Sequence, residues 1–143
     1  MQVLVVEDEA MIRMLVCDLL ETAGFSCRDA ANAVQAIALL DQGRWKPDLL
    51  VTDYNLGPGL NGRQLAQEAL RRQPGLGIAY ITGNPECFDS HAFAPFERLV
   101  AKPFAGDELI AAVRGVARRR AVLARCSHGD AAAVTAGKEP AWA

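Results

Sequence analysis

The sequence predicts an α/β fold, a doubly wound parallel sheet of five strands with helices on both faces. Three observations predict it. Short apolar runs, typical of strands covered on both faces, recur along the chain. Segments with apolar residues at helical spacing alternate with these runs. The connections are short, so each crossover should be right-handed and each strand parallel to its neighbours.

The first strand and the first helix have the clearest patterns. Residues 3–6, Val-Leu-Val-Val, form a continuous apolar run and predict a buried strand. A helix follows and ends at Gly24. Its apolar residues at helical spacing are Ile12, Leu15, Val16, Leu19 and Ala23. Residues 25–30 alternate weakly between apolar and polar, which predicts an edge strand.

The middle of the chain repeats this unit. Asn32 is a predicted N-cap for a second helix. The apolar face of that helix is formed by Ala33, Ala36, Ile37 and Leu40. Residues 48–53 predict the next buried strand, and residues 65–70 carry the apolar face of a third helix, which ends at Pro74-Gly75.

The last part of the chain predicts two further strands, over residues 77–82 and 98–101. Residues 86–94, between them, predict a short helix. A final amphipathic helix has acids in its first turn and arginines near its end, an order that suits the helix dipole. Its apolar residues are Leu109, Ala112, Val113 and Val116. We expect one domain over residues 1–120, and a helix extension with a flexible tail over residues 121–143.

Composition narrows the class of protein. The chain has 143 residues, of which 51% are hydrophobic and 22% are charged, as in a globular domain. A net charge of −2 gives no basic field for nucleic acid, and no apolar run is long enough to span a membrane. We therefore expect a cytoplasmic protein. The cysteines Cys17, Cys27, Cys87 and Cys126 form no CxxC pair and no metal spacing, which favours reduced core or surface thiols over a disulfide framework.

Polar residues that suit phosphate and metal chemistry stand at the ends of the predicted strands. Glu7 and Asp8 follow the first strand, Asp53 closes the third, Thr82 closes the fourth and Lys102 follows the fifth. Because ligands bind in open parallel sheets at the carboxyl ends of the strands, these groups should meet in one crevice. In the simplest topology the third strand lies beside the first, so the three carboxylates come together.

Each residue has an ordinary explanation when it is taken alone. Acids are common at helix N-termini, and a threonine at a strand end reflects β-propensity. Together the residues are more specific, because clustered carboxylates need a cation and Mg²⁺ prefers oxygen ligands. A carboxylate beside a divalent cation can attack phosphorus, and an ammonium group suits phosphate. Pro103 is a candidate for a cis peptide bond that aims Lys102 inward.

On these residues the chain resembles a response regulator receiver domain, the phosphoacceptor half of two-component signalling. The resemblance covers residues 2 to about 120 and implies the flavodoxin-like strand order 2-1-3-4-5. It implies that Asp53 is the phosphorylated aspartate. It further implies that Asp8, Asp53 and the backbone carbonyl of Asn55 bind Mg²⁺ directly, and that Glu7 helps through water.

The resemblance also implies roles for Thr82 and Lys102 and for partner proteins. Thr82 matches the family's switch hydroxyl, and Lys102 matches the lysine of the family's phosphorylation site. In the family, both residues hold phosphoryl oxygens. The phosphoryl group would come from a histidine kinase or a phosphotransfer protein in a phosphorelay, and the output would be contact with a downstream protein target. The receiver would catalyse its own phosphorylation and dephosphorylation and no other reaction.

Three departures from the family pattern bear on how the domain would switch. The family usually has an aromatic residue three positions before the lysine, where this chain has Leu99. The segment between Asp53 and Gly62 is one residue longer than the common form. The interval from Thr82 to Lys102 is short, with Pro85, Pro95 and Gly83 weakening any helix in it. We hypothesise that switching uses order and disorder of residues 83–97 instead of an aromatic rotamer.

Two other functions fit parts of this pattern. An aspartyl-phosphate-type phosphatase would need a second acid two residues after the nucleophile, where this chain has Asn55. A receiver-like binding scaffold would never be phosphorylated and would not need this set of charges. The preferred function is a single-domain switch or phosphoryl shuttle. His91 and His128 have no metal-ligand partner at a useful spacing, and we interpret both as surface residues.

Overall fold

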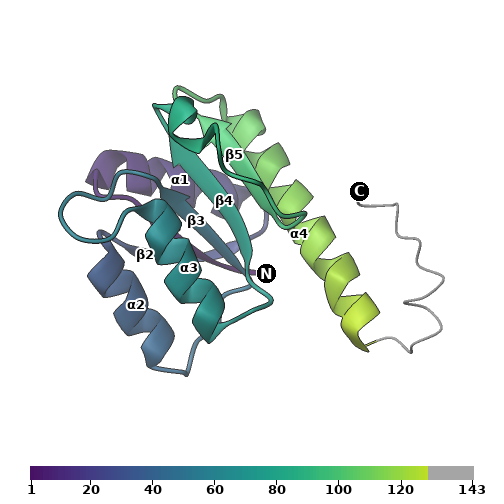
Figure 1. The fold of residues 1–143 in the computed structure, drawn as a ribbon. Coiled ribbons are helices and arrows are strands. Elements are labelled where there is room, and N and C mark those ends of the chain that lie inside the picture. Colours follow the sequence, from purple (N-terminus) through teal and green to yellow (C-terminus); the bar gives the residue numbers. More distant parts are fainter. Residues whose placement is uncertain (129–143) are drawn as a thin grey trace.

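The computed structural model describes residues 1–128, with side chains to residue 119. Its five strands are parallel and form one sheet in the order β2-β1-β3-β4-β5 (Figure 1). The strands are β1 (Gln2–Val6), β2 (Ser26–Ala30), β3 (Leu49–Asp53), β4 (Gly77–Thr82) and β5 (Glu97–Ala101). This confirms the predicted fold class and strand order.

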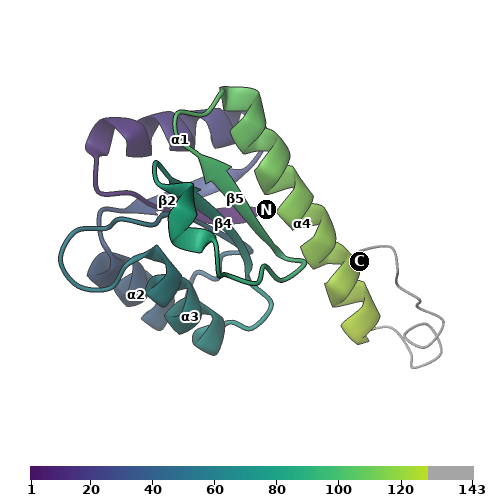
Figure 2. The same cartoon turned by 45° about the horizontal axis from the view of Figure 1, so that its top comes forward.

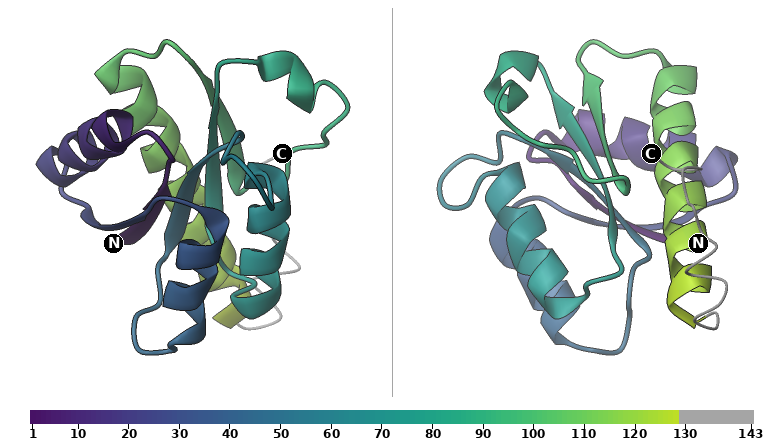
Figure 3. Two further views of the ribbon diagram at one scale, coloured as in Figure 1. Left: turned by 90° about the vertical axis from the view of Figure 1, so that its left-hand side faces the viewer. Right: turned by 45° about the vertical axis from the view of Figure 1, so that its right-hand side comes forward.

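In the described part of the chain, four α-helices cover the sheet, two on each face (Figures 2 and 3). They are α1 (Ala10–Thr22), α2 (Ala33–Asp41), α3 (Gly62–Arg72) and α4 (Gly106–His128). In Figures 2 and 3, α1 and α4 lie on one side of the sheet and α2 and α3 on the other. The apolar strand residues therefore face two separate cores, one of which is closed by Val16, Leu20, Leu109, Val113 and Val116. This burial on both faces explains why the central strands are continuous apolar runs.

Two asparagines fix where helices begin. Asn32 caps α2 as predicted, because its side chain accepts a hydrogen bond from the Gln35 amide at 2.9 Å. Asn61 caps α3 in a full capping box with Gln64, whose side chain accepts from the Asn61 amide at 2.9 Å. The capping box fixes the point at which the chain leaves the loop after β3 and enters α3.

The helix predicted over residues 86–94 is absent from the structure. Only a 3-10 turn forms there, Pro85–Phe88, and the chain then crosses without regular structure to β5. The two prolines and the short path from β4 to β5 leave no room for a longer helix. The turn is nevertheless anchored, because the Phe88 side chain is buried in the core.

The helix predicted to extend beyond residue 120 is present, because α4 continues to His128. Residues 129–143, which hold most of the predicted tail, lie outside the described residues. In the part of the chain that the structure covers, no helix is both long and apolar enough to cross a membrane.

Candidate functional site

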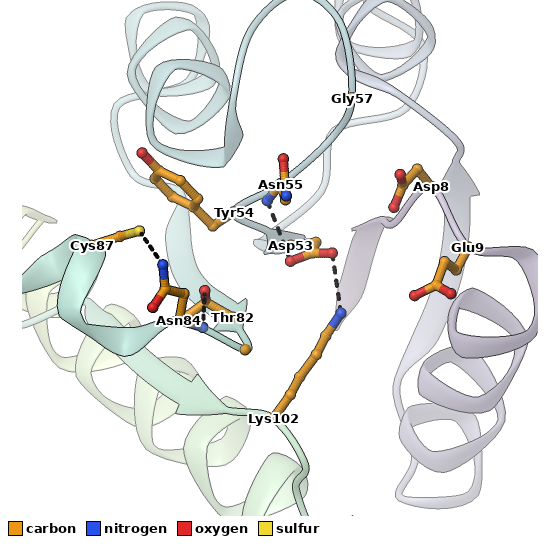
Figure 4. A pocket seen from close by; sticks show the side chains of 11 residues that line it. Asp8, Glu9, Asp53, Tyr54, Asn55, Gly57, Thr82, Asn84, Cys87 and Lys102 are labelled. Atoms are coloured by element: carbon orange, nitrogen blue, oxygen red, sulfur yellow. Dashed lines mark hydrogen bonds and ion pairs between the residues drawn. The ribbon is translucent and has the colours of Figure 1, made fainter.

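Three carboxylates and one ammonium group meet at the carboxyl ends of the strands. Figure 4 shows two of the carboxylates, those of Asp8 and Asp53, together with Lys102. Glu7, Asp8 and Asp53 each place a carboxylate oxygen within 4.8 Å of the other two. The Nζ atom of Lys102 lies 3.1 Å from Oδ2 of Asp53 and 3.3 Å from Oε1 of Glu7. The sequence prediction that these four residues share one crevice is therefore confirmed by the geometry.

The Glu7 carboxylate is buried, with 2% of the residue exposed, whereas Asp8 points into the open pocket. Burial is the main cause that raises the pKa of Glu7 to about 7, and the negative charge of Asp53 contributes to the rise. A hydrogen bond from the Glu9 amide lowers this pKa, but the lowering is smaller than the effect of burial. The cluster thus contains more negative charge than one lysine offsets, as expected of residues that bind a cation.

Lys102 reaches the cluster from the end of β5. Its amide donates to the Thr82 carbonyl at 2.7 Å, and the peptide bond to Pro103 is cis, as the sequence suggested. Partial burial lowers the pKa of Lys102, but the Asp53 and Glu7 carboxylates outweigh burial and hold that pKa above its ordinary value. Lys102 is therefore a fixed positive charge beside Asp53.

Thr82 lies on the opposite side of the pocket from Asp8. Its side chain is nearly buried, and its Oγ1 accepts a hydrogen bond from the Asn84 amide at 3.0 Å. The hydroxyl proton is therefore left for an acceptor inside the pocket. The pocket has a volume of about 570 Å³. It is lined by Asp8, Glu9, Asp53, Tyr54, Asn55, Gly57, Thr82, Gly83, Asn84, Cys87 and Lys102.

The loop after β3, residues 54–61, is held at both ends. The Tyr54 amide donates to the Ile81 carbonyl at 2.9 Å, and the Gly62 amide donates to the Tyr54 carbonyl at 2.7 Å. The chain approaches itself so closely there that a Cβ on Gly62 would overlap the Asp53 carbonyl oxygen. Asn55 lines the pocket, and its amide points to Oδ1 of Asp53 at 3.4 Å.

An aromatic cluster beside the pocket was not predicted. Phe88 packs against Tyr54 and Tyr80, with ring centroids 5.4 and 4.8 Å away. Glu97 is buried below them and accepts from the Tyr80 hydroxyl at 3.3 Å, and its Oε1 lies 3.0 Å from Nε2 of His91. The interpretation of His91 as a simple surface residue is therefore wrong. Tyr80 lies two residues before Thr82 on the same strand face, which is the one sequence signal that could have revealed the cluster.

Comparison with known proteins agrees with this geometry. A family model of the response regulator receiver domain matches residues 3–114. The phosphate regulon transcriptional regulatory protein PhoB of Pseudomonas aeruginosa is 35% identical over 135 residues, covering 92% of this chain and 55% of PhoB. PhoB of Escherichia coli is 34% identical over 127 residues, covering 86% of this chain and 54% of PhoB. The chain thus spans about half the length of the curated relatives it matches.

Solved structures show the same fold. A response regulator receiver protein from Sinorhizobium medicae has a TM-score of 0.76 and 28% identity, covering 83% of this chain and 95% of its own. The response regulator protein TrrA from Thermotoga maritima, solved in complex with Mg²⁺-BeF, has a TM-score of 0.70 and 27% identity, covering 80% of this chain and 97% of its own. From its sequence match, its strand order and its acidic pocket, the chain belongs to the response regulator receiver domain family.

Proposed function

We propose that this domain accepts a phosphoryl group on Asp53 from the phosphohistidine of a histidine kinase or a phosphotransfer protein, with Mg²⁺ bound beside Asp53. The observation that carries the proposal is the position of Asp53. The residue is 6% exposed, and its carboxylate lies in a polar pocket beside the Lys102 ammonium and the two acids that follow β1. A buried acid in such surroundings is typical of a functional group.

The residues present fit Mg²⁺. The carboxylates of Asp8 and Asp53 would bind it directly, and the buried Glu7 would bind through water. The backbone carbonyl of Asn55 is predicted to bind the ion directly as well, as a third protein ligand beside Asp8 and Asp53. When bound, the metal supplies positive charge that offsets the charge of the transferring phosphoryl oxygens.

The remaining chemistry belongs to the side chains of this chain. An Asp53 carboxylate oxygen attacks the phosphorus atom, the O–P bond forms, and the N–P bond of the donor breaks with its electron pair passing to the imidazole. Lys102, already 3.1 Å from Asp53, then pairs with a phosphoryl oxygen. Thr82 donates its hydroxyl proton to another, since its own oxygen already accepts from Asn84.

The same residues argue against a wider enzymatic activity. A phosphatase of the aspartyl-phosphate type uses a second acid two residues after the nucleophile to protonate the leaving group. Asn55 occupies that position and has no proton to give in this way. We therefore propose that the domain catalyses its own phosphorylation and dephosphorylation and does not turn over other phosphate esters.

The partners follow from the site and the family. The matched relatives are named as transcriptional regulators and are about twice as long as the matched region. The role of the chain as a single-domain switch or phosphoryl shuttle, without contact to nucleic acid or membrane, stays a prediction for these 143 residues. A histidine kinase or phosphotransfer protein upstream and a protein target downstream are the proposed partners, and the cytoplasm is the proposed location.

The test is intact-protein mass spectrometry after incubation with acetyl phosphate and Mg²⁺. We expect one added phosphoryl group, about 80 Da, in the wild type and in the control variant Asp89→Asn, and none in Asp53→Asn. Addition that persists in Asp53→Asn would refute Asp53 as the acceptor. Steady hydrolysis of p-nitrophenyl phosphate would favour the phosphatase, and a complete lack of reaction would favour the scaffold.

A further inference from the structure

Two cysteines lie next to each other where α1 packs on β2. Cys17 is in α1 and Cys27 is in β2. Both side chains are partly buried and pack against the same apolar core. The sequence spacing predicted reduced core or surface thiols, and the fold brings together a pair that no motif indicated.

An ion pair fixes the register that places these thiols together. Nε of Arg13 lies 2.9 Å from Oδ2 of Asp29. Arg13 is one helical turn before Cys17, and Asp29 is two residues after Cys27, so each element uses one face for both contacts. Arg13 also donates to the Glu7 carbonyl at 2.8 Å, which ties the start of α1 to the end of β1.

The register brings the two thiols within reach of each other, because Cys17 lies one helical turn after Arg13 and Cys27 lies two residues before Asp29. Interaction with Cys27 lowers the pKa of Cys17, and interaction with Cys17 together with burial raises the pKa of Cys27. Burial and the nearby acids Asp29, Glu21 and Asp18 oppose the lowering at Cys17. The pair therefore has a distinct nucleophile, Cys17, and a second thiol within reach of it. Because both side chains keep partial solvent exposure, a small oxidant can reach them.

We propose that Cys17 and Cys27 are an oxidisable pair that closes to an intramolecular disulfide when the domain meets a low-molecular-weight disulfide such as glutathione disulfide. The Cys17 thiolate attacks one sulfur of the oxidant, a mixed disulfide forms, and one glutathione leaves with the electron pair and takes up a proton. Cys27 then loses its proton, attacks the Cys17 sulfur and expels the second glutathione. The two cysteines lose two electrons and two protons, and the oxidant is reduced to two thiols.

The bond would join an edge strand to the helix that covers it. β2 is an outer strand of the sheet, and α1 is the helix that follows Asp8. A link between them constrains the unfolded chain, so the oxidised domain should be more stable than the reduced one. The proposal does not depend on phosphorylation of Asp53.

One tryptic peptide tests the pair directly. Residues 14–28 contain both cysteines and no internal lysine or arginine, so a disulfide between them stays within that peptide. The reduced full chain is incubated with glutathione disulfide, alkylated and digested without reduction. We expect this peptide about 2 Da lighter than its reduced form, with neither thiol alkylated. The same peptide found alkylated at both cysteines, or carrying glutathione on each, would overturn the proposal.

Variants separate the pair from the other thiols. Cys87→Ser should leave the lighter peptide unchanged, and Cys27→Ser should stop at a single glutathione adduct on Cys17. The thermal midpoint gives a second measure, since oxidation should raise it in the wild type and in Cys87→Ser and leave it unchanged in Cys27→Ser. Loss of the lighter peptide in Cys87→Ser, or a wild-type midpoint that does not rise on oxidation, would contradict the assigned pairing.

Discussion

The ring of Phe88 meets the ring of Tyr54 edge-on, with centroids 5.4 Å apart and planes inclined at 72°. Tyr54 directly follows Asp53, so this contact joins the proposed phosphoacceptor to the segment between β4 and β5. Leu99, at the position where the family usually has an aromatic residue, packs in the core beside this cluster. A change at Asp53 therefore has a direct path to residues 83–97 through Tyr54 and Phe88.

We predict that a phosphoryl mimic changes the order of this segment. Beryllofluoride with Mg²⁺ should alter amide hydrogen exchange in residues 83–97, because ligand contact at Asp53 and Thr82 shifts the chain that follows each of them. Residues 33–41 of α2, away from the pocket, serve as the internal control. In Phe88→Ala the segment should exchange faster before any ligand is added. Equal exchange with and without the mimic would reject this switching hypothesis.

Replacing Lys102 should separate metal binding from phosphorylation. In Lys102→Met the cation that competes for the Asp53 and Glu7 carboxylates is removed, so Mg²⁺ should bind more tightly. Phosphorylation by acetyl phosphate should slow by about 100-fold, because a fixed positive charge on the phosphoryl oxygens is lost. Calorimetric titration and intact mass measure the two effects, and Lys46→Met, at an exposed position, is the control. Weaker Mg²⁺ binding in Lys102→Met would contradict this assignment.

Glu7 should give the metal-free domain a distinct pH dependence. Its pKa of about 7 lies above the ordinary value of 4.5, so the folded state holds the proton more tightly than the unfolded state. The resulting stabilisation is complete below about pH 4.5 and is lost as the pH rises to about 7. With chelator present, the thermal midpoint should therefore fall more steeply over this range in the wild type than in Glu7→Gln.

Binding of Mg²⁺ should become stronger over the pH range in which the metal-free domain loses stability. A metal-binding carboxylate must be deprotonated, so the affinity for Mg²⁺ should increase as the pH rises to 7 and above. Glu7→Gln should bind Mg²⁺ with less dependence on pH. Thermal midpoints that run parallel for the two proteins without metal would show that Glu7 does not titrate in this range.

Glu97 should stabilise the segment that replaces the predicted helix. It accepts from the Tyr80 hydroxyl and from the Ala94 amide at 2.9 Å, and it contacts His91. Glu97→Ala leaves these groups without their acceptor and should cost about 2–4 kcal/mol in the free energy of unfolding. Tyr80→Phe should cost about 1 kcal/mol. Urea unfolding measures both, and a double variant whose cost equals the simple sum would argue against a shared network.

Gly62 should not tolerate a side chain. A Cβ there meets the Asp53 carbonyl oxygen and the Tyr54 backbone, neither of which can move freely. Gly62→Ala should lower the free energy of unfolding by about 1–3 kcal/mol and slow phosphorylation, since Asp53 would shift. Gly75→Ala, where no atom lies within 4 Å of the new Cβ, is the matched control. Equal stability of the two variants would contradict the close approach.

The sequence predicted the sheet and the site for one physical reason. Buried parallel strands need continuous apolar runs, and the groups at their ends are brought together by the topology alone. Asp53, Thr82 and Lys102 each follow such a run, so their meeting could be predicted without knowledge of side-chain packing. The start of α2 was predicted through Asn32, because capping is a local interaction.

What the sequence did not predict depends on contacts between distant elements. Phe88, Tyr80 and Glu97 lie on three different segments, and no periodic pattern relates them. Cys17 and Cys27 meet through the packing of a helix on a strand, in a register fixed by Arg13 and Asp29. The helix expected over residues 86–94 does not form, because the connection from β4 to β5 is short and contains two prolines, which outweighs the local helix propensity.

The loop between β3 and α3 is fixed at both ends, and this bears on how far its sequence and length can vary. Hydrogen bonds at Tyr54 and Gly62 and the capping box at Asn61 hold both ends of the loop. Between these ends the chain turns sharply at Gly57 and Gly59, whose φ angles are 79° and 96°. Residues inserted between Gly57 and Gly59 would extend into solvent and would not move Asp53. The length and sequence of the middle of this loop can therefore vary without displacing the Asp53 carboxylate.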